Sequence, residues 1–225
     1  MESIKVGKIS YDKSFASGFN FYKLFWIFFI GCIMGVVIET IWCLATGFHF
    51  ESRTGLIYGP FNPVYGFGAL FMTIALYWIR NKSDRWILIG GTIVGAAFEY
   101  ICSWVQEMIF GTVSWDYSNY PFNLNGRICL LYSLFWGILA LVWLKHIFPL
   151  MTKYIEKIPN SFGKSLTFVL LIFMVFNVLM SSAVVSRLVD RRNAVPVSNS
   201  FERYIDERYP DERVNKIYPN MRFIE

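Results

Sequence analysis

Long apolar blocks limit the folds open to this chain more than any other feature of its sequence. Blocks of about 20 apolar residues are long enough to cross the hydrocarbon core of a bilayer as helices. Hydrophobic residues make up 55% of the 225 positions and charged residues only 16%, which is too apolar for one water-soluble core. The composition excludes a disordered chain and argues against a soluble enzyme.

The blocks predict an all-α, polytopic transmembrane bundle with about five spans. The predicted spans are residues 21–46, 64–79, 86–110, 128–148 and 166–188. The second is short, and the run Gly59–Gly68 before it fits inside a membrane only where it packs against protein. We expect residues 1–20 to form a cytoplasmic segment, 21–188 the transmembrane domain and 189–225 a polar tail.

Lysines and arginines predict the orientation in the cell membrane. Eleven of them, Lys5 and Lys8 included, lie in the N-terminal segment, between the second and third spans, or in the segment before the fifth, counting Lys23 and Lys145 at the span ends that adjoin these segments, and only two lie in the other connections. We therefore expect a cytoplasmic N-terminus and, after five spans, a C-terminus outside. Arg187, Arg191 and Arg192 directly follow the fifth span and oppose that placement of the tail.

Several classes of chemistry are not expected. The net charge of +5 is spread over short connections, which is typical of membrane orientation and not of nucleic-acid binding. The four cysteines lack CxxC spacing, and His49 and His146 stand in no metal spacing, so we expect no metal. Gly163-Lys164-Ser165 resembles the end of a phosphate loop, but Ile158 replaces the required glycine. We predict no cofactor and no catalytic residue.

One pattern recurs with a shift of 60 residues and predicts an internal duplication. The first and third spans both contain G-x-x-x-G-x-x-x-E, formed by Gly31, Gly35 and Glu39 and by Gly91, Gly95 and Glu99. A Pro-Phe-Asn turn follows each, at Pro60–Asn62 and Pro121–Asn123. The predicted units are residues 21–80 and 86–148, which share one orientation because each contains two spans.

Residues four apart lie on one helix face, so each G-x-x-x-G-x-x-x-E pattern forms a stripe of two glycines and a glutamate along its helix. Small residues let helices approach closely in lipid, and we expect the first and third spans to cross there. Glu39 and Glu99 would then lie close together as binding or pathway residues. A structural alternative pairs them with Arg53 and Arg127. The other polar candidates are Ser103, Glu107 and Asp116.

The outer loops supply a second set of candidates, with simple structural roles as the alternative. The loop-motif residues are Pro60, Asn62, Pro63, Tyr65, Pro121 and Asn123. Prolines also serve to begin helices after tight turns. Between the fourth and fifth spans, residues 145–158 have apolar positions at helical spacing between lysines. They predict an amphipathic helix at the cytoplasmic interface, either as a plain connector or as a docking site for an ATPase.

The tail contains two short predicted helices. Ser200 is placed to cap the first, Phe201–Tyr209, and Asp211 begins the second. Phe201, Tyr204 and Ile205 would share one face and dock the tail, whereas a solvated tail is the alternative.

These segments resemble a bacterial family of multi-spanning proteins known as ABC-transporter permeases. The resemblance rests on the runs Gly35–Glu39, Gly59–Gly68, Glu99–Trp104, Trp115–Tyr117 with Pro121–Cys129, and the tail segments Tyr209–Arg213 and Tyr218–Met221. It implies a transport component that works with a separate ATPase, and it carries over no substrate and no catalytic residue.

Three functions follow from the sequence. The first is a permease-like component that moves small or amphiphilic solutes past the paired glutamates. The second is a membrane enzyme on a lipid or lipid-linked substrate, with Glu39 or Glu99 as acid or base. The third is a non-catalytic scaffold. The bilayer is the expected partner in each case, and a homo-oligomer is compatible with all three.

Overall fold

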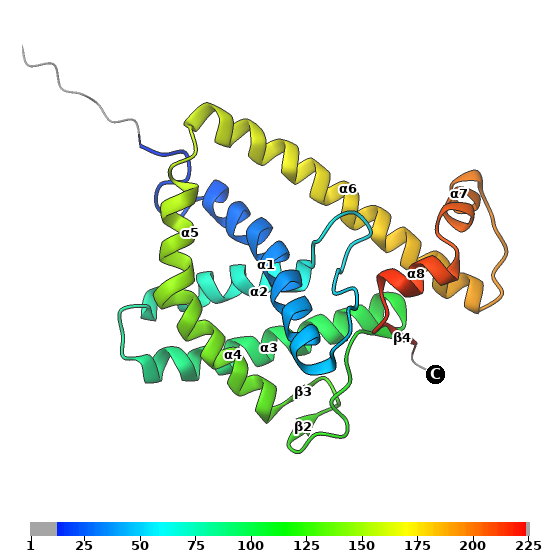
Figure 1. The fold of residues 1–225 in the computed structure, drawn as a ribbon, viewed down its shortest axis with the longest axis horizontal. Helices are drawn as coiled ribbons and strands as arrows, with labels where there is room; N and C mark the ends of the chain where they lie inside the picture. Colours follow the sequence, from blue (N-terminus) through cyan, green and yellow to red (C-terminus); the bar gives the residue numbers. More distant parts are fainter. Residues whose placement is uncertain (1–12, 224–225) are drawn as a thin grey trace, which may run out of the picture.

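The computed structural model describes residues 13–223, so Lys5 and Lys8 lie outside the described part of the chain. Long helices dominate, and short strands pair beyond their ends (Figure 1). The helices are α1 (Phe21–Gly47), α2 (Pro63–Leu76), α3 (Asp84–Phe110), α4 (Leu130–Val142), α5 (Phe148–Ile155), α6 (Asn160–Arg192), α7 (Ser200–Arg208) and α8 (Asp211–Ile217). A 3₁₀ turn, η1 (Tyr77–Ile79), follows α2, and a π-helical turn, η2 (Trp143–Ile147), joins α4 to α5.

The strands each contain two residues and form two antiparallel pairs. Strand β1 (Thr112–Val113) pairs with β4 (Arg222–Phe223), and β2 (Asn123–Leu124) pairs with β3 (Ile128–Cys129). The first pair joins the loop after α3 to the end of the tail, and the second closes a hairpin before α4.

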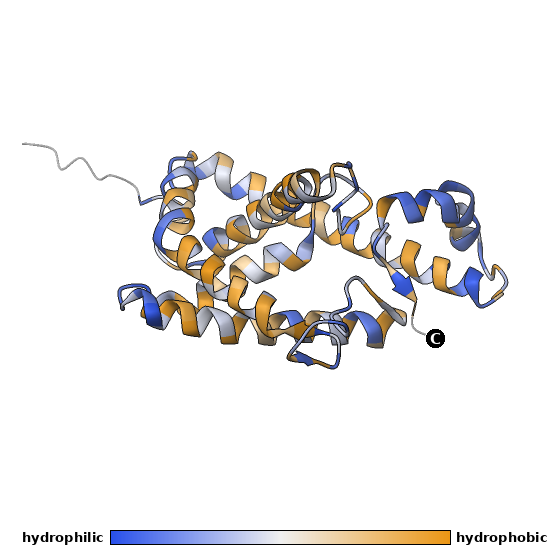
Figure 2. Ribbon diagram, turned by 60° about the horizontal axis from the view of Figure 1, so that its bottom comes forward, coloured by the Kyte–Doolittle hydropathy of each residue, from blue (hydrophilic) through white to orange (hydrophobic). Residues whose placement is uncertain are grey.

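Four helical stretches of the described residues are long and apolar enough to cross a membrane. They are α1, α3, Leu130–Ile155 and α6, and Pro63–Ile79 is a shorter apolar helix. Figure 2 shows hydrophobic residues along these helices, whereas hydrophilic residues gather at turns and in the tail. The predicted helical membrane bundle is confirmed.

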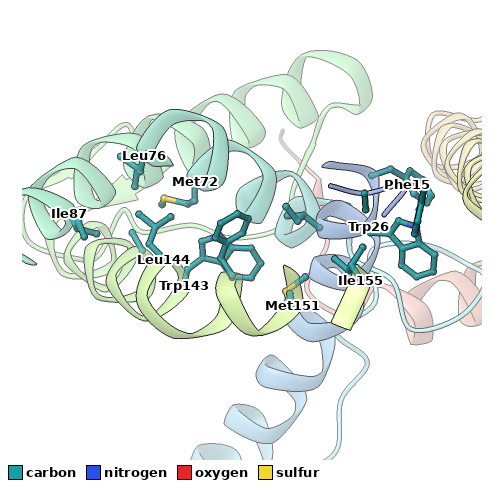
Figure 3. Close-up of a cluster of buried hydrophobic side chains, with 14 residues drawn as sticks. Phe15, Trp26, Met72, Leu76, Ile87, Trp143, Leu144, Met151 and Ile155 are labelled. Atoms are coloured by element: carbon teal, nitrogen blue, oxygen red, sulfur yellow. The ribbon is translucent and has the colours of Figure 1, made fainter. Parts of the chain in front are cut away.

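The helices pack as two hairpins, α1 with α2 and α3 with α4, and α2 lies against α3. A hydrophobic cluster joins both hairpins to α5 (Figure 3). Two tryptophans of this cluster bury their ring N–H groups, which need acceptors there. Trp26 donates to Thr167 Oγ1 at 2.9 Å, and Trp143 donates to Thr73 Oγ1 at 2.8 Å. These bonds fix how α1 sits on α6 and how η2 sits on α2.

The segment 145–158 does not form a helix separate from α4. Its first eleven residues continue α4 through η2 into α5, and Phe148, Met151 and Ile155 lie in the hydrophobic cluster. The π turn ends just before Pro149, which has no N–H to donate to the preceding turn and whose ring crowds it. Widening the turn allows the helix to pass the proline, so this stretch continues α4, and its place at the membrane interface stays a prediction. The apolar spacing reflects burial against α1 and α2.

The connection between α1 and α2 folds back between the helices. Asn62 N donates to Cys32 O at 3.1 Å, about 16 Å along α1 from Phe21 at ~1.5 Å per residue. Asn177, which is fully buried on α6, holds Tyr58 through both backbone groups, at 3.2 and 2.7 Å. Backbone polar groups at such depth need protein partners, and α1 and α6 provide them. The run Gly59–Gly68 and the residues just before it thus pack against protein, as their irregular backbone requires.

The tail docks on the C-terminal part of α6, beside which α7 and α8 lie in Figure 1. Arg187, only 4% exposed, donates to Asp206 Oδ2 at 2.7 Å, and Arg191 donates to Asp211 Oδ1 at 2.6 Å. Acidic groups of the tail thus neutralise arginines that had seemed to oppose its placement. Arg192 lies over the Phe223 ring at 4.2 Å.

The docked face of the tail differs from the predicted one. Ile205 is 1% exposed and packs with Tyr209, but Phe201 and Tyr204 are about half exposed. The ion pairs made by Asp206 turn α7 so that Ile205 and Tyr209, four residues apart, face α6. Asn199 rather than Ser200 caps the helix, because its side-chain oxygen accepts from Glu202 N at 2.9 Å.

Connections that the sequence assigns to opposite sides lie at opposite ends of the bundle. At one end Phe15 N donates to Asn160 Oδ1 at 2.7 Å, and Lys145 pairs with Asp84 at 3.3 Å. At the other end the tail joins the α1–α2 connection through Tyr209 and Tyr58, whose hydroxyls lie 2.9 Å apart. The grouping agrees with the charge pattern, and the assignment of the first end to the cytoplasm stays a prediction.

Candidate functional site: two carboxylates between the hairpins

The glycine stripes pack within each hairpin, not between α1 and α3 as predicted. A Cβ on Gly31 would lie 3.0 Å from Ala69 Cβ and 3.2 Å from Gly66 Cα, both on α2. The same atom on Gly91 would lie 2.3 Å from the Cβ of Ala140 on α4. Small residues therefore bring α1 onto α2 and α3 onto α4, as expected for helices that pack without a hydrophobic driving force.

The second glycine of each stripe makes room for an aromatic ring. A Cβ on Gly35 would lie 2.1 Å from Tyr65 Cγ, and one on Gly95 would lie 2.3 Å from Trp136 Cβ. No real Cβ approaches so closely, so only glycine fits at these two positions. Each ring is then held beside the glutamate one turn further along the helix.

Glu99 is buried, with 7% of its surface exposed, and is bound by neutral donors. Tyr117 Oη donates to its Oε1 at 2.8 Å, and Trp136 Nε1 donates to its Oε2 at 2.9 Å. Burial and the nearby Glu99 charge raise the pKa of Tyr117 well above its usual range, so its hydroxyl keeps the proton that it donates. The carboxylate is thus fixed in place without a cationic partner.

Glu39 is half-buried and faces the Tyr65 hydroxyl. Its predicted partner Arg53 pairs instead with Glu51, at 3.1 Å between Nη2 and Oε2. Arg53 acts on Glu39 only as a nearby charge. The predicted Glu39–Arg53 ion pair is therefore wrong, because a closer carboxylate two residues before Arg53 takes its place.

The predicted Glu99–Arg127 pair is also wrong. Arg127 forms its ion pair with Glu107 and donates to Ser103 Oγ at 3.2 Å. Ser103 and Glu107 lie one and two turns beyond Glu99 on α3, so their shared face is correctly predicted. They hold the loop before α4 and line neither cavity described below.

Two cavities of about 410 and 530 Å³ adjoin at the carboxylates. Six side chains line both, and both predicted glutamates are among them. The six are Glu39, Arg53, Tyr65, Glu99, Tyr117 and Trp136. The smaller cavity extends towards α6 and the tail, and the larger extends towards the end of α1. Volumes of this size are typical of small-molecule sites.

The first loop motif lies at the site. Asn62 caps α2 by accepting from Val64 N at 3.1 Å, and its amide donates to Arg53 O at 3.3 Å. Pro63 occupies the first turn, where a missing N–H costs nothing. Both residues line the smaller cavity, whereas Pro60 does not. A structural role and a place on the cavity wall coincide here.

The second loop motif lies away from the cavities. Asn123 belongs to the β2–β3 hairpin and donates to Ser118 O and Tyr120 O at 3.2 and 2.9 Å, with Pro121 exposed in the turn. The two Pro-Phe-Asn turns therefore have different geometry. Asp116 accepts from Ser118 N and Oγ at 2.9 and 2.6 Å, which lowers the pKa of its carboxyl and fixes the turn.

Several residues that line the cavities were missed. Trp136 and Tyr132 of α4 looked like ordinary span residues, and Tyr218 and Met221 reach the smaller cavity from the tail. The repeated aromatic-Gly-x-x-Ala pattern, Tyr65–Ala69 and Trp136–Ala140, was the available signal.

Cys43, His49 and Glu51 also come together, with one potential ligand atom from each within 4.8 Å of the others. Their spacing is irregular because α1 ends at Gly47 and the next residue, Phe48, has a left-handed conformation with a φ of 53°. Glu51 Oε2 already bonds Arg53, and this cation competes with a metal ion for the same oxygen. The Gly47 carbonyl and Glu51 raise the pKa of His49, which favours an ionic network.

The chain matches the protein family described as "Putative ABC-transporter type IV" over residues 26–182. The matched region runs from the first turns of α1 to the C-terminal half of α6 and contains both glutamates and, apart from Val185, the cavity-lining residues outside the tail. Nothing among the curated proteins or the solved structures matches the chain.

Proposed function

Because the chain belongs to the ABC-transporter type IV family, we propose that it is the membrane-embedded permease component of a transporter. The observation that carries this proposal is the pair of carboxylates, Glu39 and Glu99, on the wall shared by two cavities. An ionisable side chain at membrane depth is costly, at roughly 2.5–3.5 kcal/mol on insertion scales, and typically marks a substrate or ion pathway. The solute would pass the six shared side chains.

The energy for transport would come from a separate ATPase, since the sequence has no complete phosphate loop. The end of the bundle that carries most of the positive connections is the expected docking side. There Lys153, Tyr154 and Lys157 are exposed on or just after α5, and their neighbours Met151 and Ile155 are anchored in the hydrophobic cluster. Because α5 continues α4, an ATPase that binds the exposed basic and aromatic side chains of α5 would transmit its motion to α4 and so to Trp136.

The ATPase is tested by purifying the tagged chain from its native membranes. We expect a protein with a phosphate loop to copurify and the pair to hydrolyse ATP. Replacing Tyr154 and Lys157 together by alanine should release that subunit. Ile172→Ala, an exposed position on α6, should retain it. Recovery of the chain alone, at full yield and without ATPase activity, would contradict the proposal.

The role of the carboxylates is tested by complementation of a deletion strain. Glu99→Gln keeps the acceptor for Tyr117 but cannot carry charge, so the variant should fold and fail to complement. Glu207→Gln, on the exposed face of α7, is the matched control and should complement. Full complementation by both Glu39→Gln and Glu99→Gln would exclude an essential charge at this site.

A further inference from the structure

The cavity wall carries more acidic than basic side chains that are free of an ion-pair partner. Glu39 and Glu99 form no ion pair with a Lys, Arg or His among residues 13–223. Arg53 also lines both cavities, but the Glu51 carboxylate neutralises it. His49 lines the larger cavity and pairs with the same Glu51 at 3.3 Å. Even with His49 protonated, the three ionised carboxylates of Glu39, Glu51 and Glu99 outnumber the two cations, Arg53 and His49.

When they are ionised, Glu39 and Glu99 need a partner of opposite charge. An ionised carboxylate away from water is costly unless it is paired, and Glu99 is only 7% exposed. Its two hydrogen bonds come from a phenol and an indole, which orient the carboxylate but add no positive charge. Each oxygen still has acceptor capacity, because a carboxylate offers about four lone-pair sites. A cationic ligand would use that capacity and balance the charge.

Aromatic rings surround the carboxylates. Tyr65, Tyr117 and Trp136 line both cavities, and Trp42 and Tyr132 line the larger one. Tyr117 and Tyr132 stack with their centroids 4.8 Å apart and their planes at 20°. The faces of tyrosine and tryptophan rings attract cations electrostatically, and the attraction grows when the contact is shielded from water. Carboxylates amid such rings are suited to an organic cation.

A bare metal ion fits this wall poorly. Calcium and magnesium are held by about six or more oxygen ligands at about 2.0–2.6 Å, whereas ring faces and the Trp136 N–H, which are not ligands, take up much of the wall beside the two carboxylates. An ammonium group needs no such coordination sphere. Leu56, Val64 and Phe110 line the smaller cavity, and Phe135 and Leu139 line the larger. These apolar side chains would accommodate hydrocarbon attached to the cation.

We propose that the two cavities form a binding site for an organic ammonium cation with an apolar substituent, held by Glu39, Glu99 and the surrounding rings. This inference rests on the proposed function only for the claim that the cation is transported. The ammonium group would belong either to a free amine or to an amine-bearing lipid headgroup, because the same contacts recognise both.

Binding is measured on the purified full-length chain in phosphatidylglycerol nanodiscs, without ATP or any partner. The probe is radiolabelled benzyltrimethylammonium, and unlabelled phenylacetate and benzyl alcohol are the anionic and neutral competitors. We expect saturable binding that neither competitor displaces. Binding should weaken at least tenfold in Glu99→Gln and in Glu39→Gln, and Glu207→Gln should bind like wild type. Glutamine keeps the shape of glutamate, so these variants should fold, and thermal unfolding confirms that they do.

Replacing the nanodisc lipid with phosphatidylethanolamine separates the two sources. Loss of probe binding there would assign the site to an amine-bearing headgroup, and unchanged binding would assign it to a free amine. Absence of saturable binding in both lipids, or equal binding by wild type and both glutamine variants, would overturn the inference. Failed complementation by Glu99→Gln without any ammonium binding would leave the permease proposal in place and refute only the substrate class.

Discussion

The contact between α3 and α4 predicts a large effect of a single methyl group at Gly91. A Cβ there would lie 2.3 Å from Ala140 Cβ, whereas two carbon atoms normally lie about 3.5–4.0 Å apart. The neighbours are a Cβ and the backbone of Gly137 and Trp136, which cannot move aside as a flexible side-chain end can. The helices would have to separate by more than 1 Å.

Overpacking of this kind costs typically 1–3 kcal/mol, and the stiffness of both partners places Gly91→Ala near the upper value. A loss of about 3 kcal/mol corresponds to roughly a hundredfold in the unfolding equilibrium. Gly68→Ala is the matched control in the same bundle. Its Cβ would meet Phe98 and Trp136 at 3.4 Å, which is ordinary contact, so its stability should change by less than about 1 kcal/mol.

The chain offers a reciprocal rescue. Ala140→Gly removes the methyl that Gly91→Ala would strike, and the nearest remaining atom is then Gly137 Cα at 3.1 Å. The double variant should recover most of the lost stability, which gives a favourable coupling energy in a double-mutant cycle. Tryptophan fluorescence during thermal unfolding in detergent measures wild type, the three single variants and the double variant. Equal unfolding temperatures for Gly91→Ala and Gly68→Ala, or no rescue by Ala140→Gly, would refute the close-packing argument.

Three further predictions concern the loop, the tail and the topology. Asn177→Leu should destabilise the chain by about 2–4 kcal/mol, because both backbone groups of Tyr58 lose their hydrogen-bond partner within the bundle. Hydrogen exchange at residues 55–62 should then rise, and unchanged protection would contradict this. The Arg187 and Arg191 guanidiniums lower the pKa of Asp206, so the stability of the docked tail is present above the unfolded pKa of about 3.9 and is lost as pH falls through the lower folded value. Proteolysis of α7 should begin in that acidic window, and an identical acid transition in Asp206→Asn would exclude this carboxyl. Cysteines at Asn119 and Glu207 should react with an impermeant thiol reagent in intact cells, and one at Lys82 only after lysis; opposite labelling of Asn119 and Glu207 would contradict the docked tail.

The helices were predictable because membrane spans are set by length and apolarity, which are local properties of the sequence. The fold-back of residues 55–62 was only partly predictable. The run of glycine and proline indicated irregular backbone, but its acceptors and donors, Asn177 and Ser181, lie more than 100 residues away on α6. The docking of the tail depends on the pairing of Arg187 with Asp206, which lies on another element.

At the site, the sequence identified the two glutamates but not what surrounds them. Helix periodicity places Gly35 and Glu39 on one face, and it says nothing about which helix fills the space beside them. The choice of ion-pair partner was also beyond reach, because Glu51 and Glu107 compete for Arg53 and Arg127 and only distance decides between them. The role of Trp136 is established by its contact with Gly95, and the aromatic-Gly-x-x-Ala repeat was its only trace in the sequence.

The duplication stays a prediction, but the contacts change which residues of the two hairpins should be aligned with each other. In both hairpins a small-residue pair meets the first glycine and an aromatic ring meets the second: Gly66, Ala69 and Tyr65 in one, Gly137, Ala140 and Trp136 in the other. These second-helix residues are offset by 71 positions, whereas the stripes are offset by 60. The difference falls in the connection that contains the β2–β3 hairpin, which is why the Pro-Phe-Asn turns match in sequence yet differ in geometry. If the units share an origin, the aligned pair across α2 and α4 is Tyr65 with Trp136, and each then places one aromatic hydrogen-bond donor beside one glutamate.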